Sequence, residues 1–249
     1  MMDGLSVATS ILTRAVTLDT NQRFTESLVC YQEGINVLIE TLKTVPNDDP
    51  KKNKIRLKTE EYMSRAEKVK QHIEELKNTG NYREQIQVPE DSIGFSYRSV
   101  LHRFLNEDVK SVEIDDPYVR SPHQCDNFVR FLELCIQSCS KLRVVKLVTG
   151  RDGNNPTDQV KRLETIQDSL QKISKKSNKD QVRLFIEYSD SLHDREIRLD
   201  NGWVIKIGRG LDYFKQLDRF HIGFTDFDFR PCRSTTIDVF HKKELQQIK

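Results

Sequence analysis

The sequence predicts two domains of different class. An all-α three-helix bundle is expected over residues 1–80 and an α/β domain over residues 95–249, joined by a linker at 81–94. The first 80 residues show no strand-like alternation of apolar and polar side chains, whereas the C-terminal part alternates strands with helices. Charged residues make up 31% of the chain and hydrophobic ones 36%, a ratio that favours two small domains over one large domain.

Three amphipathic stripes predict the helices of the N-terminal bundle. Apolar side chains recur at helical spacing over residues 11–18, 24–42 and 55–76. Breaker residues separate the segments, at Val45–Pro50 before the third stripe and at Asn78–Asn81 after it. Three such helices with short connections form an antiparallel bundle.

Strands and helices alternate along the C-terminal part, which indicates parallel β-α-β units with helices packed on a sheet. The predicted elements are helices at 95–105, 128–139 and 157–174, and strands at 109–114, 142–148 and 182–188. A hairpin follows, in which two short strands over 193–210 flank a tight turn at Asp200-Asn201-Gly202. From about Arg209 onward aromatic and charged residues are mixed, and no element is predicted.

Composition excludes several classes of protein. Forty Lys and Arg residues against 38 Asp and Glu give a net charge of +2, which is too balanced to indicate a nucleic-acid-binding protein, so any basic face must be local. We expect neither a transmembrane helix nor a signal peptide, because no suitable apolar run is present. The five cysteines form no C-x-x-C pair, and their odd number indicates reduced thiols in a cytoplasmic protein. We expect no metal site and no cofactor.

One apolar residue of the third helix stands outside its core stripe. Met63 follows the core residue Tyr62 and lies one position off the stripe. The positions a turn or two away on the same face are Arg56, Thr59, Glu60, Glu67 and Lys70. Such a row can form one wall of a groove for an amphipathic helix of a partner, with Met63 as an adaptable contact. The alternative is that Met63 only packs at the edge of the bundle.

Three segments of the bundle form a known pattern. They are Ala15-x-x-x-Asp19, Leu28-x-x-Tyr31-x-x-Gly34 and Tyr62-Met63-Ser64-Arg65-Ala66-Glu67-x-x-Lys70. With them, residues 5–80 resemble the MIT (microtubule-interacting and transport) domain. The resemblance implies a groove between helices two and three that binds a C-terminal helical motif of ESCRT-III subunits, with leucines against Met63 and a basic side chain against Glu67. Gly34 stands where the family usually has Ala, a change that costs about 1 kcal/mol inside a helix.

The hairpin carries the pattern His193-x-Arg195-x-x-x-x-Asp200. Because side chains alternate along a strand, His193 and Arg195 are expected on one face, an arrangement that suits a phosphate. The pattern resembles the H-x-K-x-x-x-x-D signature of the phospholipase D superfamily, in which the His attacks phosphorus and the Lys binds phosphate oxygens. If the domain is active, the resemblance makes His193, Arg195 and Asp200 the catalytic residues of a phosphodiesterase with a dimeric active site.

Several departures from that signature favour a domain without catalysis. Arg195 replaces the Lys, and Gly208-Arg209-Gly210 stands in place of a later Gly-Ser, which removes a hydroxyl group. The turn explains Asp200 on its own. No second full motif is present, because His241-x-Lys243 repeats the first half but Ile248 stands at the position of the acid.

Binding of an anion is then the expected role of this domain. Its candidate phosphate and membrane contacts are His193, Arg195, Lys206, Arg209, Lys215 and Arg219. Trp203, Tyr213 and Phe214 are interleaved with them, and such rings can enter a membrane interface while cations hold acidic headgroups. The alternatives are a solvated charged face, since Asp212 and Asp218 dilute the cations, and a bare scaffold that binds no membrane.

Four segments extend the resemblance across almost the whole chain. They are Gly94-Phe95-Ser96-Tyr97, Glu113-x-Asp115-Asp116-Pro117-Tyr118-x-Arg120, His193-Asp194-Arg195-Glu196-Ile197-Arg198 and Ile207-Gly208-Arg209-Gly210-Leu211-Asp212-Tyr213-Phe214. With them, the chain resembles a family of non-catalytic ESCRT-III adaptors. The resemblance implies a homodimer formed by the C-terminal domain, which binds acidic phospholipid membranes peripherally and no nucleic acid. It implies action in cytokinetic abscission, from the cytoplasm, at the midbody and on endosomal membranes.

Overall fold

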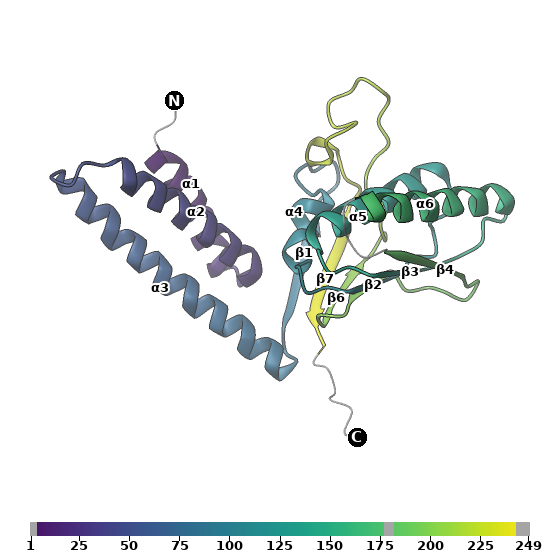
Figure 1. Ribbon diagram of the computed structural model, residues 1–249, viewed down its shortest axis with the longest axis horizontal. Coiled ribbons are helices and arrows are strands. Elements are labelled where there is room, and N and C mark those ends of the chain that lie inside the picture. The colour runs from purple at the N-terminus through teal and green to yellow at the C-terminus, as the bar shows by residue number, and fades with distance from the viewer. Residues whose placement is uncertain (1–3, 177–181, 243–249) are drawn as a thin grey trace. The chain divides into compact units, whose positions relative to one another are not determined.

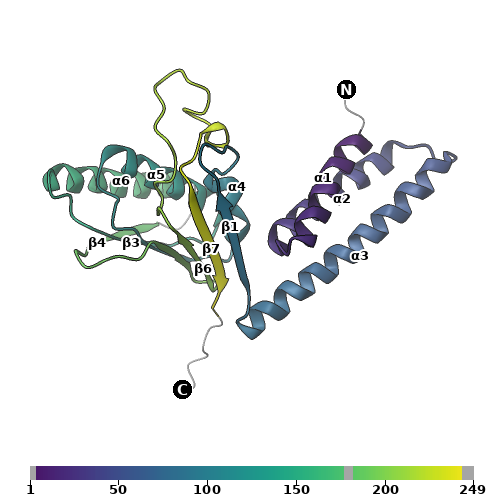
Figure 2. The ribbon, with the colours of Figure 1, turned by 180° about the vertical axis from the view of Figure 1, so that it is seen from behind.

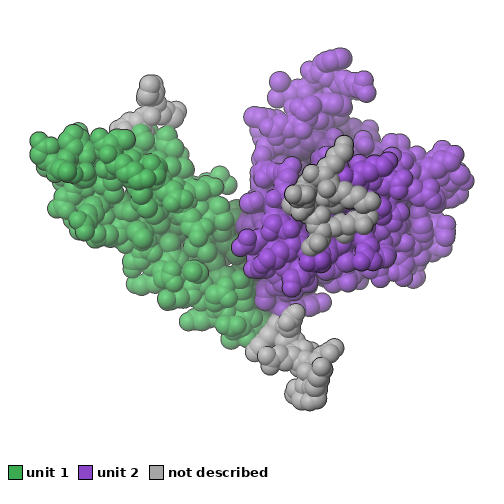
Figure 3. All heavy atoms as spheres, viewed as in Figure 1, with its two compact units in different colours: residues 1–84 green, residues 85–249 purple. Residues whose placement is uncertain are grey.

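The structure, a computed structural model, describes residues 4–176 and 182–242. The chain divides into two compact units, residues 1–84 and 85–249 (Figure 3). The first unit is a helical bundle and the second is built on a mixed sheet, which confirms the predicted fold class.

In the helical unit, the long third helix begins and ends between the breaker residues that the sequence predicts. Its helices are α1 (Gly4–Thr20), α2 (Phe24–Thr44) and α3 (Pro50–Thr79). The side chain of Asp49 caps α3 by accepting a hydrogen bond from the amide of Lys51, and Pro50 occupies the first helical turn. Gly80 ends the helix at φ 70°, and its amide donates to the carbonyl group of Lys77.

Helices α1 and α2 approach each other closely at Gly34. A Cβ atom at this position would lie 2.6 Å from Cγ of Leu12, whose side chain is buried. The glycine therefore has a packing reason, and the close helix contact it allows offsets its low helix propensity.

The second unit contains a seven-stranded sheet with the order β1-β7-β6-β5-β2-β3-β4. The strands are β1 (Arg83–Val88), β2 (Ser111–Asp115), β3 (Val144–Thr149), β4 (Arg183–Tyr188), β5 (Glu196–Leu199), β6 (Trp203–Ile207) and β7 (Thr235–His241). Strands β2, β3 and β4 are parallel, as predicted. The predicted hairpin β5–β6 is antiparallel, and β7 pairs with β6 in the same sense.

Two long helices cover one face of this sheet. They are α5 (Pro122–Ser138), which connects β2 to β3, and α6 (Pro156–Lys176), which connects β3 to β4. Figures 1 and 2 show both on the same side of the strands, as two right-handed crossovers require. A short helix α4 (Tyr97–Leu101) and 3₁₀ turns at His102–Phe104 and Phe227–Phe229 complete the unit. No helix of the described ranges is long and apolar enough to cross a bilayer.

The prediction of a linker at 81–94 is wrong for residues 83–88, which form β1. Glu84, Ile86 and Val88 are buried while Gln85 and Gln87 are exposed, so the segment alternates like any half-buried strand. The unpredicted C-terminal segment forms a long loop over residues 208–234 followed by β7. Lys243 and Ile248 of the incomplete second motif lie outside the described residues.

Candidate functional site

The strand register brings several chain segments together at one end of the sheet. Asp115 ends β2 and pairs with Glu196 at the start of β5, which in turn pairs with Lys206 near the end of β6. We call this the carboxyl end of the sheet; its segments are residues 116–121, 150–155, 189–195 and 208–234. Ligands of open α/β sheets bind beyond the carboxyl ends of the parallel strands.

Arg195 lies at the carboxyl end, just before β5, and its half-buried guanidinium group is held by two contacts. It donates a hydrogen bond to the carbonyl oxygen of Gly208, and it lies 4.6 Å from the centre of the Tyr118 ring. The guanidinium group of Arg120 lies 5.3 Å from the centre of the same ring. Two cations therefore stack on one tyrosine, which fixes their positions and suits them to hold a phosphate.

The carboxylate of Asp116 is buried close to the charge of Arg195. Its carboxylate accepts hydrogen bonds from the amides of Tyr118 at 3.0 Å and Leu211 at 2.8 Å. Burial raises the pKa of Asp116, although the two amides and the charge of Arg195 act in the opposite direction. A Cβ atom on Gly210 would clash with this carboxylate, so the second glycine of the Gly-Arg-Gly segment has a structural explanation.

His193 also precedes β5 rather than lying in it, and its side chain is exposed. Its ring has no hydrogen-bond or ion-pair partner among the described residues. A nucleophilic histidine needs a group that orients its ring and an acid that protonates the leaving group. Among the described residues, no group orients the His193 ring through a hydrogen bond or ion pair.

Asp200 lies at the opposite end of β5 from Arg195. Five residues of extended chain separate the two by roughly 17 Å, at about 3.4 Å per residue. The carboxylate of Asp200 accepts the amide hydrogen of Lys110 at 3.1 Å, which ties the hairpin turn to the start of β2. Asp200 therefore does not share a site with His193, and the turn accounts for it.

Both of the predicted lysine contacts are paired with carboxylates. The ammonium group of Lys206 lies 3.4 Å from the carboxylate of Glu196. That of Lys215 lies 2.6 Å from Glu90 and 2.7 Å from Asp91. Neither lysine offers an unpaired charge to a ligand.

The predicted arginine contacts Arg209 and Arg219 are exposed on the loop that follows β6. The sequence pattern did not indicate Arg120 or Arg151, although both lie at the carboxyl end and Arg151 stacks on the ring of Tyr188 at 4.6 Å. Their position in the loops that follow the predicted strands at 109–114 and 142–148 is the signal that could have located them, because the ends of parallel strands lie at one edge of the sheet.

The expectation that Trp203, Tyr213 and Phe214 enter a membrane interface is wrong. These side chains are 6%, 0% and 2% exposed and belong to the core. Among the described residues of this loop, the large apolar side chains that are exposed are Phe220, Ile222 and, to a lesser degree, Phe229, none of which the sequence pattern indicated.

In the helical unit, four of the five predicted peptide contacts share an exposed surface of α3. We call these residues, Glu60, Met63, Glu67 and Lys70, the Met63 face; Met63 is 51% exposed within it. Thr59 is instead buried, and its hydroxyl group donates to the carbonyl oxygen one turn earlier at 2.9 Å. Thr59 therefore supports the helix from inside and does not line the exposed surface.

A recess of about 560 Å³ between α1 and α3 was not predicted. In it the guanidinium group of Arg65 binds both carboxylate oxygens of the buried Asp19, at 2.7 and 2.8 Å, and the hydroxyl group of Tyr31 donates to the same carboxylate at 3.1 Å. Burial, followed by the hydrogen bond to Asp19, raises the pKa of Tyr31 to about 12. These contacts join the three helices of the bundle.

Known proteins resemble both units. Residues 5–71 match the family model of the MIT (microtubule interacting and transport) domain. Residues 94–241 match the model described as the phospholipase D-like domain at the C-terminus of MIT. The chain is also similar to MIT domain-containing protein 1 of Mus musculus, with 45% identity over 245 residues that cover 98% of this chain and 95% of the mouse protein.

Proposed function

Because this chain belongs to the family in which a phospholipase D-like domain follows an MIT domain, we propose that it is a non-catalytic ESCRT-III adaptor. Its MIT domain binds the C-terminal helical motifs of ESCRT-III subunits. Its phospholipase D-like domain binds acidic phospholipid membranes and forms a homodimer. In this proposal the protein acts from the cytoplasm in cytokinetic abscission, at the midbody and on endosomal membranes.

The observation that carries the proposal is the Met63 face. Met63 is an unbranched, half-exposed apolar side chain with acids one turn before and after it on α3. An amphipathic helix can place its apolar residues on Met63 and a basic residue beside Glu60 or Glu67.

Binding of a fluorescent ESCRT-III tail peptide to the full chain tests this proposal. We expect Met63→Asp to weaken binding at least tenfold, because it removes the apolar contact and adds a third carboxylate to the face. Leu57→Asp is the matched control, since Leu57 is 58% exposed on α3 but is not part of the Met63 face. Wild-type affinity of Met63→Asp would exclude this face as the peptide site.

The carboxyl end of the sheet supports the membrane part of the proposal. Arg120 and Arg195 are held on the Tyr118 ring, and each cation near an acidic membrane adds about 1 kcal/mol of attraction. We expect the full chain to sediment with vesicles that contain phosphatidylserine or phosphoinositides, and much less with phosphatidylcholine alone.

The same purified protein tests the absence of catalysis. We expect no phosphodiesterase turnover, because the His193 ring has no orienting partner and Asp200 lies at the far end of β5. Turnover that His193→Asn abolishes would establish the enzyme instead of the adaptor.

Dimer formation would raise the overall avidity of the protein for a membrane that carries an ESCRT-III polymer. A dimer carries two MIT domains and two membrane surfaces, and an ESCRT-III polymer on a membrane presents many tails. Linked weak contacts of this kind raise avidity by about 10²–10⁴ without any new interaction. We expect a variant shown to be monomeric by sedimentation velocity to keep its peptide affinity and to lose recruitment to the midbody. Normal recruitment of that monomer would contradict the role of the dimer.

A further inference from the structure

One loop stands out from the carboxyl end of the sheet. Residues 215–226, here called the projecting loop, extend beyond the helices in both ribbon views, where they form the yellow-green loop at the top (Figures 1 and 2). The chain leaves β6 and returns to β7 at this end, so the loop rises beside the segments that hold Arg120 and Arg195.

The tip of the projecting loop presents two large apolar side chains to solvent. Phe220 is 102% exposed and Ile222 is 82% exposed. Phe220 also has φ 72°, a left-handed conformation that is unfavourable for a bulky aromatic residue. Residues in strained backbone conformations are concentrated at functional sites.

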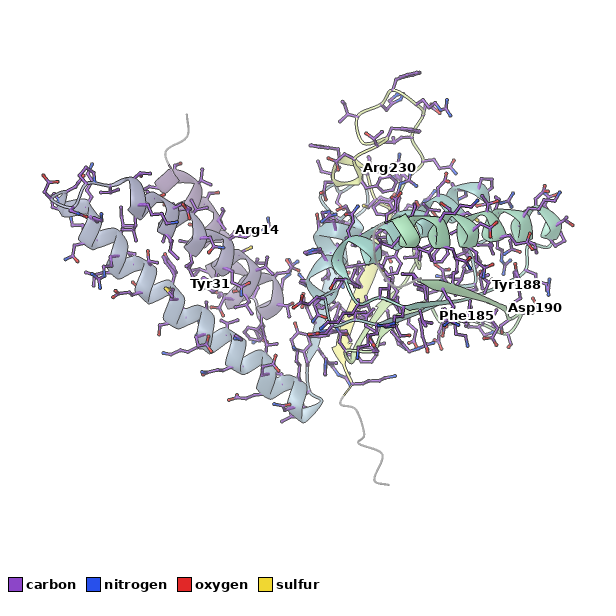
Figure 4. The ribbon with its side chains drawn as sticks, in the orientation of Figure 1. Arg14, Tyr31, Phe185, Tyr188, Asp190 and Arg230 are labelled. Atoms are coloured by element: carbon purple, nitrogen blue, oxygen red, sulfur yellow. The ribbon has the colours of Figure 1, made fainter. Side chains whose placement is uncertain are left out.

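Hydrogen bonds and a cation–π contact hold the base of the projecting loop in place. The guanidinium group of the buried Arg230 donates to the carbonyl oxygens of Gly223 and Phe224, both at 2.8 Å, and lies 4.0 Å from the centre of the Phe227 ring. Figure 4 shows Arg230 at the base of the loop. The amide of Lys215 donates to the carbonyl oxygen of Pro231 at 2.9 Å on the other strand of the loop. The tip is therefore held out from the domain by its own base.

Charge around the tip favours an acidic surface as the partner. Arg219 and His221 flank Phe220, and the acids of the projecting loop are Asp218 and Asp226. The backbone carbonyl of Asp218 lies 3.2 Å from the His221 ring. The exposed Arg209 and the stacked Arg120 lie on other segments of the same end of the sheet. Apolar groups at a tip with cations behind them match the order of a bilayer, in which acidic headgroups surround hydrocarbon.

We propose that Phe220 and Ile222 insert into the headgroup–acyl boundary of an acidic phospholipid bilayer, with Arg219 at the headgroups. The proposal rests on the membrane binding proposed above and names the residues that enter the bilayer. A bilayer fits better than a protein partner, because two side chains on a narrow tip provide much less than the roughly 800 Å² that a stable protein interface buries on each side.

Tryptophan fluorescence of full-length Phe220→Trp tests the insertion. Trp203 is buried and supplies a constant background. On phosphatidylcholine vesicles with phosphatidylserine we expect a blue shift of the added emission and quenching by lipids brominated high in the acyl chain. Co-sedimentation without a shift would overturn the insertion and leave membrane binding intact. No co-sedimentation with any acidic vesicle would overturn both. A blue shift caused by an ESCRT-III tail peptide without vesicles would assign the tip to a protein partner.

Substitution of the tip provides the second measurement. We expect Phe220→Ser with Ile222→Ser to weaken binding to acidic vesicles at least tenfold, and Phe220→Leu with Ile222→Val to retain it. Phe185→Ser is the matched control, because Phe185 is 50% exposed on β4, outside the carboxyl end (Figure 4). Equal melting temperatures of the variants would show that folding is unchanged. Wild-type vesicle binding of the double serine variant would overturn the proposal.

Discussion

Two groups of apolar side chains near the end of β6 differ in what surrounds them. Tyr213 and Phe214 pack edge-on against Tyr97, with ring centres 5.7 and 5.1 Å apart, and the hydroxyl group of Tyr213 donates to a carbonyl oxygen at 2.9 Å. Phe220 and Ile222, a few residues later, contact solvent at a loop tip. Both groups have cations beside them in the sequence. Nearness of aromatic and basic residues along a chain therefore does not locate a membrane surface, because burial decides which rings are available.

The largest expected effect is loss of stability when the buried group is truncated. Phe214→Ala should lower the free energy of unfolding by about 3–5 kcal/mol, because it leaves a cavity among aromatic rings. Phe220→Ala should change it by less than about 0.5 kcal/mol. Urea denaturation measures both, and equal destabilisation by the two changes would break the distinction between core and tip.

The next largest effect is expected at the base of the projecting loop. Arg230→Met leaves the carbonyl groups of Gly223 and Phe224 without their donor, which should cost about 1–3 kcal/mol. Amide hydrogen exchange in residues 215–226 should become faster. Arg219→Met is the control, because that side chain is exposed and should change neither quantity.

A similar contrast exists in the helical unit between its interior and its surface. Gly34→Ala should lower the free energy of unfolding by about 1–3 kcal/mol, because the added methyl group meets the buried Leu12. Met63→Ala should leave stability within about 0.5 kcal/mol of wild type and weaken only peptide binding. Thermal denaturation with a peptide titration separates the two, and a stabilised Gly34→Ala would refute the close contact.

The smallest effect concerns the turn of the hairpin. Asp200→Ala should cost about 1 kcal/mol, since one acceptor for the amide of Lys110 is lost. Vesicle binding should not change, because Asp200 lies at the end of β5 away from Arg195. The exposed Asp194 supplies the control as Asp194→Ala. A large loss of vesicle binding by Asp200→Ala would place that residue in the anion site.

Much of the fold could be predicted because its signals are local. Helical spacing gave the three helices of the bundle, and Asp49, Pro50 and Gly80 marked the ends of α3. Strand β1 was not predicted, because one of its buried positions holds an acidic residue. Glu84 accepts hydrogen bonds from Thr25 and the Tyr82 hydroxyl group at 2.8 Å, and burial raises its pKa. The pattern of apolar and polar residues along the strand does not reveal these hydrogen-bond partners.

The candidate sites were less predictable because they depend on contacts between distant segments. Arg120 and Arg195 meet on the Tyr118 ring only through the register of β2 with β5. Phe220 lies at the tip of a loop whose base is bound by Arg230, far along the chain from the segments that hold Arg120 and Arg195. By contrast, Met63 could be recognised because its surroundings lie on one helix and follow from helical spacing alone.

Recruitment of a labelled ESCRT-III tail peptide to acidic vesicles tests the central claim, that one chain joins a tail to a membrane. We predict that the wild-type chain carries the peptide into the vesicle pellet. Met63→Asp should sediment without the peptide, whereas Phe220→Ser with Ile222→Ser should leave both in the supernatant and retain peptide affinity. A wild-type chain that binds vesicles and peptide separately but never carries the peptide into the pellet would contradict the adaptor account.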